Sequence, residues 1–140
     1  MKVLLSIKPE FAEKIFTGIK RYEYRKVVYA NRSIKTIVVY ATRPMSRIVG
    51  EFDVNGIIEA TPDCLWKETQ AYSGVDREFF DAYFTGRNKA FAICVGAVRK
   101  YQLPVVPQQI IQRFVPPQSY MYVSDSLNRP SSSPLQLGLF

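Results

Sequence analysis

Residues 18–25 read Gly-Ile-Lys-Arg-Tyr-Glu-Tyr-Arg. From Lys20 onward, every second residue belongs to one of two sets. In a β-strand such alternation would place Lys20, Tyr22 and Tyr24 on one face, with Arg21, Glu23 and Arg25 on the other. A face with an acid between two arginines is atypical of a core, and a solvated edge strand with paired surface charges would explain it. The setting instead indicates a functional site, because an apolar strand and a short capped helix lead directly to Gly18, at the start of this stretch.

The composition indicates one cytoplasmic domain. The chain has 140 residues, 47% of them hydrophobic, which is enough for one core without disulfides. Cys64 and Cys94 each lie in an apolar segment, which predicts buried thiols in a reducing compartment. No segment is long enough to span a membrane or act as a signal sequence. Histidine is absent, so Ser-His and Cys-His nucleophile systems and imidazole-bound zinc are excluded.

The net charge of +7 is unevenly distributed. Between Lys20 and Arg47 there are eight basic residues and one acid, Glu23, interleaved with tyrosines. Cations that neutralise phosphates, next to rings on which bases stack, are typical of single-stranded nucleic-acid binding. The alternative is an ordinary basic surface with tyrosines that simply favour strands.

The hydrophobic periodicity, the capping residues and the glycines predict nine elements. They are strands at Lys2–Ile7, 20–29, Thr36–Ala41, Ile48–Ile58, Ala90–Val98 and Tyr120–Val123, and helices at residues 9–18, 62–72 and 76–86. A helix does not separate each pair of strands, so a doubly wound sheet does not fit. We expect an α+β fold: a small, mostly antiparallel β-barrel of five to six strands, covered by about three helices.

Residues 18–25 also fit the pattern G-x-K-x-x-E-x-R, and in this the chain resembles the ASCH domain family of the PUA-like superfamily. The flanking motifs agree: Ser6-Ile7-Lys8-Pro9, Val39-Tyr40-Ala41-Thr42-Arg43-Pro44, Val49-Gly50-Glu51-Phe52 and Tyr72-Ser73-Gly74. The resemblance covers residues 1–123 and implies a small barrel whose mouth holds a cleft for RNA or a nucleotide.

The resemblance assigns residues to this cleft. Lys20 and Arg25 would contact phosphates or base edges, and Glu23 would position them or accept a hydrogen bond from a base. The nucleic-acid-binding set, for single-stranded RNA or another nucleic acid, is Lys8, Lys20, Tyr22, Glu23, Arg25 and Arg43.

Activity transfers less readily than fold. Some ASCH proteins hydrolyse N4-acetylcytidine with a lysine, a threonine and a glutamate; the lysine corresponds to Lys20, but Glu23 occupies the threonine position. Others resemble metal-dependent ribonucleases, for which Glu23, Glu51 and Asp53 would supply oxygen ligands and Lys20 would stabilise charge. We favour binding without catalysis and expect no cofactor. For the hydrolase alternative, the catalytic candidates are Lys20, Glu23 and Glu51, with a divalent metal only in the nuclease case.

The last residues, 124–140, read as a flexible tail. Residues 128–135 are rich in serine and proline, and the chain then ends in Gln136-Leu137-Gly138-Leu139-Phe140. This ending resembles the Q-L-x-L-F peptide that docks bacterial replication and repair proteins onto the sliding clamp, with Gln136 at the groove rim and Leu137, Leu139 and Phe140 as buried anchors. The alternatives are that the peptide folds back onto the domain or is incidental.

Overall fold

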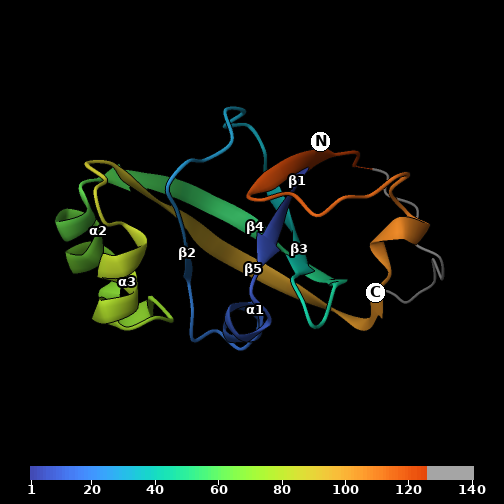
Figure 1. Cartoon of the computed structure of the whole chain (residues 1–140), viewed down its shortest axis with the longest axis horizontal. Helices are drawn as coiled ribbons and strands as arrows, with labels where there is room; N and C mark the ends of the chain where they lie inside the picture. The colour runs from blue at the N-terminus through green and yellow to red at the C-terminus, as the bar shows by residue number, and fades with distance from the viewer. Residues whose placement is uncertain (126–140) are drawn as a thin grey trace.

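The computed structural model describes residues 1–125, and within them six strands form one sheet in the order β2-β5-β4-β3-β1-β6 (Figure 1). The strands are β1 (Lys2–Ile7), β2 (Tyr22–Arg25), β3 (Thr36–Ala41), β4 (Arg47–Ala60), β5 (Ala90–Val105) and β6 (Tyr120–Val123). Only β1 and β3 pair in parallel, so the sheet is mostly antiparallel, as predicted.

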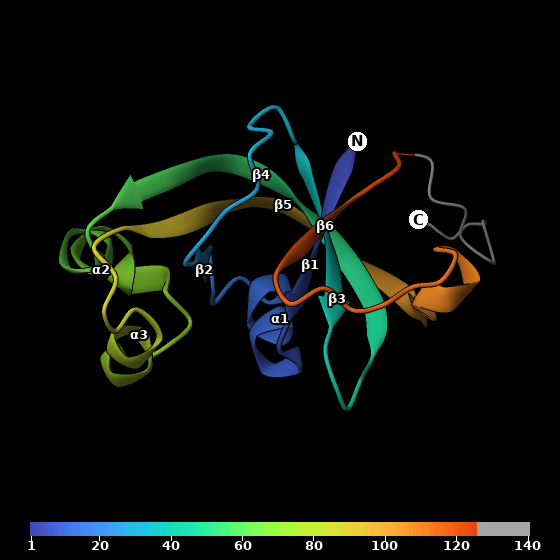
Figure 2. The ribbon, with the colours of Figure 1, turned by 45° about the horizontal axis from the view of Figure 1, so that its top comes forward.

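The expected α+β class is confirmed, but the expected barrel is not closed. Strands β2 and β6 are the two edges of the sheet, and no pairing joins them within residues 1–125. The sheet still curls, since the long strands β4 and β5 shift register at three places along their pairing and bend together across the molecule (Figure 2). The two edges of the sheet stay apart because β2 is short: it ends at Arg25 rather than near Tyr29.

Three α-helices form where the sequence supplies caps. Helix α1 (Pro9–Phe16) starts with proline at its first turn, and Gly18 adopts a φ of 86° just after it. Helix α2 (Pro62–Thr69) is capped by the Thr61 side chain and continues into the short 3-10 helix η1 (Gln70–Tyr72). Helix α3 (Arg77–Tyr83) is capped by Asp76. A second 3-10 helix, η2 (Pro107–Gln109), follows β5.

The helices position the candidate site. In Figures 1 and 2, α2 and α3 lie together at one end of the β4–β5 ribbon, and α1 lies beside the middle of the sheet. Ala12 and Ile15 bury α1 against β1 and β3, while Leu65 and Phe80 bury α2 and α3 against β2 and β5. Strand β2 therefore runs between α1 on one side and the pair α2 and α3 on the other.

Gly50 on β4 permits a close approach of α1. A Cβ at this position would lie 2.6 Å from the Phe16 ring and 2.5 Å from the carbonyl oxygen of Arg99, so only glycine fits. The motif glycine therefore fixes α1 against the sheet rather than forming part of a site.

One of the two cysteines is not buried as predicted. Cys64 is exposed on α2, so the prediction of a buried thiol is wrong there, because the residue falls on the outer side of the helix; Cys94 is partly buried.

In the described part of the chain, no helix has the length and apolar character needed to cross a bilayer. The division into a domain at 1–123 and a tail stays a prediction, because residues 126–140, with Gln136, Leu137, Leu139 and Phe140, lie outside the described residues.

Candidate functional site

A pocket of about 380 Å³ opens between α1, α3 and the edge strand β2. Its inner wall is formed by Lys20, Glu23 and Arg25, and its outer rim includes Lys8 at the start of α1 and Gln118 before β6. The remaining lining is apolar or aromatic: Ile7, Phe11, Tyr24, Val75, Phe79 and Tyr83, with Ser6 beside them. The pocket thus combines charged groups with an apolar wall, as small-molecule sites do.

Lys20 is the deepest charged group, with its side chain 1% exposed. Its Nζ donates to the carbonyl oxygen of Ser73 at 2.7 Å and lies 4.7 Å from the centre of the Tyr24 ring. Burial lowers the pKa of Lys20 to about 8; the charge of Glu23 opposes this shift, and nearby cations add to it. About a tenth of the Lys20 side chains would therefore be neutral at pH 7.

Gly74 makes room for Lys20. Gly74 has a φ of 71°, and a Cβ there would lie 2.5 Å from the Cβ of Lys20. The same turn is held from α1 by Lys14, whose Nζ donates to the Gly74 carbonyl at 3.0 Å. Two lysines from one side of the pocket therefore fix the turn that leads into α3 on the other side.

Glu23 and Arg25 form a buried ion pair, with Arg25 Nη2 2.9 Å from Glu23 Oε2. The other carboxylate oxygen of Glu23 lies 3.9 Å from Lys20 Nζ, so one carboxylate faces two cations. Arg25 also donates to the carbonyl of Ser6 on β1 at 2.8 Å and, at 3.4 Å, to Ser119 just before β6. Its Nε is buried and has no hydrogen-bond partner among residues 1–125.

These contacts correct the idea of a solvated charged face. Glu23 and Arg25 are only 6% and 8% exposed, because β2 turns them toward β1 across the unpaired edge. Arg21 alone fits the solvated interpretation, since it is exposed and stacks on Tyr72 at 4.5 Å. Lys20 precedes β2, so the predicted alternation applies only from Tyr22 onward.

Tyr24 forms a rigid wall behind Lys20. Its hydroxyl and that of Thr69 are 2.6 Å apart, and Thr69 donates in turn to the carbonyl of Leu65 on α2. Burial raises the pKa of Tyr24 to about 12, so its phenol stays protonated at any physiological pH.

Comparison with known proteins settles the family. The model of the ASCH domain matches residues 5–102. The chain belongs to the ASCH domain family. It is similar to the ASCH domain-containing ribonuclease of Zymomonas mobilis, at 28% identity over 128 residues that cover 87% of this chain and 84% of that protein.

Two further likenesses extend this result. The crystal structure of ASCH from Zymomonas mobilis matches with a TM-score of 0.81 at 26% identity, covering 89% of each chain; the structure of its variant with one serine changed to alanine gives the same values. The large ribosomal subunit protein uL22 of Ureaplasma parvum is 27% identical over 103 residues, which are 73% of this chain but 33% of that protein. The chain therefore spans about a third of the length of this ribosomal relative.

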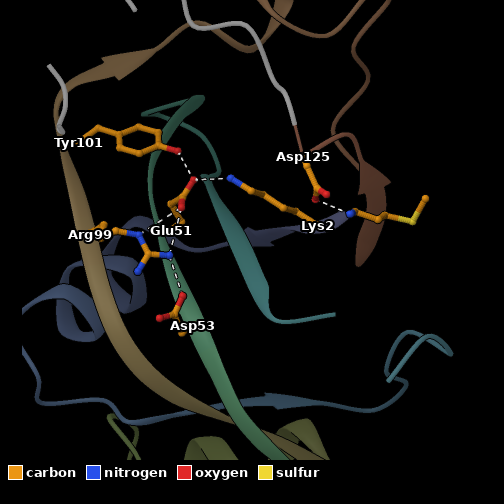
Figure 3. Close-up of polar contacts among 7 residues, drawn as sticks. Lys2, Glu51, Asp53, Arg99, Tyr101 and Asp125 are labelled. Carbon is orange, nitrogen blue, oxygen red and sulfur yellow. Dashed lines mark hydrogen bonds and ion pairs between the residues drawn. The ribbon is translucent and has the colours of Figure 1, made fainter. Parts of the chain in front are cut away.

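In this ASCH domain the predicted catalytic set does not come together. Glu51 lies on β4 in a separate cavity of about 50 Å³ that shares no residue with the pocket. Figure 3 shows its carboxylate between Lys2, Arg99 and Tyr101, whose hydroxyl donates to it at 2.7 Å. Burial opposes ionisation, but the hydrogen bond from Tyr101 and the charge of Lys2 outweigh it and lower the pKa of Glu51.

The three carboxylates proposed as metal ligands also stay apart. Asp53 pairs with Arg99 at 2.7 Å, next to Glu51, whereas Glu23 lies in the pocket. Within residues 1–125, no three Asp, Glu or Cys side chains are grouped so as to hold a metal ion. Any divalent ion at the pocket would have Glu23 as its one carboxylate ligand from the lining.

The predicted nucleic-acid-binding residues also fall into two groups, inside and outside the lining of the pocket. Lys8 joins Lys20, Glu23 and Arg25 in the lining of the pocket. Tyr22 is partly buried against the helices α2 and α3, outside the lining. Arg43 is exposed in the loop after β3, also outside the lining, so its role stays a prediction.

Sequence reasoning missed three aromatic lining residues, Phe11, Phe79 and Tyr83. The spacing of Phe79 and Tyr83 suggested core, since aromatic pairs four apart on a helix usually pack inward. Phe80 and Phe84 form a second such pair, and the spacing alone does not tell which of these rings packs inward.

The pKa of Lys20 predicts how stability depends on pH. Because the folded pKa is about 8 and the unfolded value is near 10.5, the unfolded chain binds more protons between these limits, and stability rises with pH across them. Replacing Lys20 by Met removes this dependence and the cost of burying the charge, which is on the order of 3 kcal/mol at most. We expect Lys20→Met to raise the free energy of unfolding at pH 7 by about 1 kcal/mol or more, after loss of the hydrogen bond to Ser73.

Urea denaturation from pH 7 to 10 would measure this, with the exposed Lys67→Met as control. The difference between Lys20→Met and wild type should shrink as the pH rises, and the control should show no such trend. Parallel curves for wild type and Lys20→Met would contradict the assignment.

Proposed function

We propose that the pocket binds one nucleotide of single-stranded RNA. The observation that supports this most strongly is the charge of the pocket: three cations, Lys8, Lys20 and Arg25, and one carboxylate, Glu23, line about 380 Å³. The surplus of positive charge attracts a phosphate, and the rings of Phe11 and Tyr24 suit a base. A space of this size accepts an unpaired nucleotide rather than a duplex.

The buried groups have distinct roles in this proposal. Lys20 offers an ammonium whose carboxylate neighbour is 3.9 Å away, so it can gain a stronger partner from an anionic ligand. The Nε of Arg25 is buried and has no hydrogen-bond partner among residues 1–125. Glu23 holds both cations in place and can accept a hydrogen bond from a base amino group. The similarity to the ribonuclease from Zymomonas mobilis supports RNA as the ligand.

The binding test is anisotropy with a labelled single-stranded oligouridylate whose 2′-hydroxyls are methylated to prevent cleavage. Lys20→Met should weaken binding at least about 10-fold, since a desolvated cation–phosphate contact is lost. Lys67→Met makes the same charge change outside the pocket and should bind as wild type does. RNA duplex and DNA of the same sequence should bind more weakly. Equal affinities of Lys20→Met and wild type would refute the proposed site.

Cleavage of the bound RNA is the second candidate, favoured by the lowered pKa of Lys20. At pH 7 roughly a tenth of Lys20 would be neutral and able to act as a base. In that role it takes the proton of a 2′-hydroxyl, whose oxygen attacks the adjacent phosphorus. The bond from phosphorus to the 5′-oxygen breaks, and the leaving oxygen takes a proton from water. The products are a 2′,3′-cyclic phosphate and a 5′-hydroxyl, with Arg25 stabilising the charge of the transition state.

This mechanism predicts a pH profile with a defined sign. The cleavage rate on unmodified RNA should rise between pH 6 and 8 and level off above about 8, as Lys20 loses its proton. Lys20→Arg keeps the charge but cannot act as a base near neutral pH, so it should bind RNA and lose at least about 100-fold in rate. Measurements with and without magnesium would separate metal-assisted cleavage. A rate independent of pH, or an active Lys20→Arg, would eliminate Lys20 as the base.

Amide hydrolysis of a modified nucleoside gains less support from the pocket. Its described lining holds one aliphatic hydroxyl, Ser6, which already donates to the carbonyl of Pro117 at 2.7 Å. Glu23 occupies the place of a threonine nucleophile and is committed to Arg25.

We also propose, from sequence alone, that Gln136–Phe140 binds a bacterial sliding clamp. Full-length protein should bind purified clamp in surface plasmon resonance, and a chain that ends at residue 135 should not, while its thermal melt stays unchanged. Absence of binding by the full-length protein at high micromolar concentration would end this hypothesis.

A further inference from the structure

We propose that Phe79 and Tyr83 of α3 form a stacking subsite for the base that follows or precedes the nucleotide in the pocket. The protein would then hold two consecutive nucleotides of single-stranded RNA. This inference rests on the proposed function of the pocket and adds a second subsite to it.

The aromatic residues of helix α3 have different environments, and Tyr83 is partly buried against the core cluster, with its ring edge-on to Phe84 at 4.8 Å. Phe80 and Phe84 are 1% and 3% exposed and fill the core under the helix, beside Tyr24 and Leu65. Phe79 is 37% exposed although it lines the pocket. Because Phe80 and Phe84 already satisfy the packing of α3, core formation does not account for the position of Phe79.

The two rings have the geometry of a platform. Phe79 and Tyr83 are parallel to within 8°, with ring centres 6.3 Å apart, and both border the pocket. Phe11 meets Phe79 edge-on at 5.2 Å and so fixes its orientation. An exposed, oriented ring face next to a nucleotide site is the arrangement on which bases of single strands stack.

A cation lies over each ring. Lys8 Nζ is 5.5 Å from the centre of the Phe79 ring, and Lys26 Nζ is 4.9 Å from that of Tyr83. Neither lysine forms an ion pair within the described residues, whereas several cations elsewhere do: Lys2, Arg77, Lys89, Arg99 and Lys100. Two unneutralised ammonium groups along the platform suit the phosphates on either side of a stacked base.

The test compares mono-, di- and tetrauridylates, each with a 5′-phosphate and methylated 2′-hydroxyls. Wild type should bind the dinucleotide about 10-fold more tightly than the mononucleotide, the increment typical of one stacked base. Phe79→Leu keeps apolar contact with Phe11 but has no ring face, so the ratio of its dinucleotide affinity to its mononucleotide affinity should fall to about 1, whatever the loss of a lining side chain does to the mononucleotide. Phe79→Trp should retain the increment. Tyr72→Leu, a change at an exposed ring outside the pocket, is the matched control and should behave as wild type.

The outcomes separate the two proposals. Equal affinity of wild type for mono- and dinucleotide, or a full increment in Phe79→Leu, would overturn the subsite and leave the pocket intact. Equal weakening of mono- and dinucleotide binding in Phe79→Leu would also overturn it, since Phe79 would then act only on the nucleotide in the pocket. If wild type binds none of the three ligands, the proposed function fails, and the subsite with it.

Discussion

The ion pair between Glu23 and Arg25 lies where the sheet fails to close, and the pocket depends on it. Backbone pairing cannot join the four-residue β2 to the β1–β6 edge, so the guanidinium of Arg25 bridges the gap to the carbonyl of Ser6 and to Ser119. A closed barrel would have filled this space with paired strands. The gap instead leaves a cavity in which charged groups meet an apolar wall, with helices on both sides. The carboxylate of Glu23 offsets the charge of the two buried cations, Lys20 and Arg25.

Such a cluster is a poor way to stabilise a fold. Buried ion pairs seldom repay their desolvation, and Lys20, whose pKa falls because of burial, shows that its charged form is disfavoured where it lies. The surrounding structure nevertheless makes room for it: Gly74 leaves space for its side chain, and the Ser73 carbonyl accepts its hydrogen bond. A site that is costly to the fold and yet held by specific contacts is typical of function rather than of packing.

The sequence predicts local structure here better than it predicts the site. Strand Thr36–Ala41 and the start of α1 at Pro9 were predictable because β-branched residues and an N-terminal proline act locally. The separation of Glu51 from Lys20 was not, because both occur in motifs of one family and only tertiary structure shows that they line different cavities. Likewise Phe79 and Phe80 are adjacent identical residues, and the rotation of α3 alone decides which one is buried.

The ion pairs around β4 and β5 differ from those at the pocket. Around β4 and β5, Arg99 is neutralised by Glu51 and Asp53, and Lys100 by Glu13, so these cations contribute little to the field outside the protein. At the pocket, Glu23 alone faces Lys20 and Arg25, and Lys8 stands over aromatic rings. Within residues 1–125, the pocket therefore places cations beside aromatic rings. A polyanion with flexible, unstacked bases can pair with the cations and stack on the rings at once. A duplex or an acidic protein cannot do both, because neither presents unstacked bases to the rings.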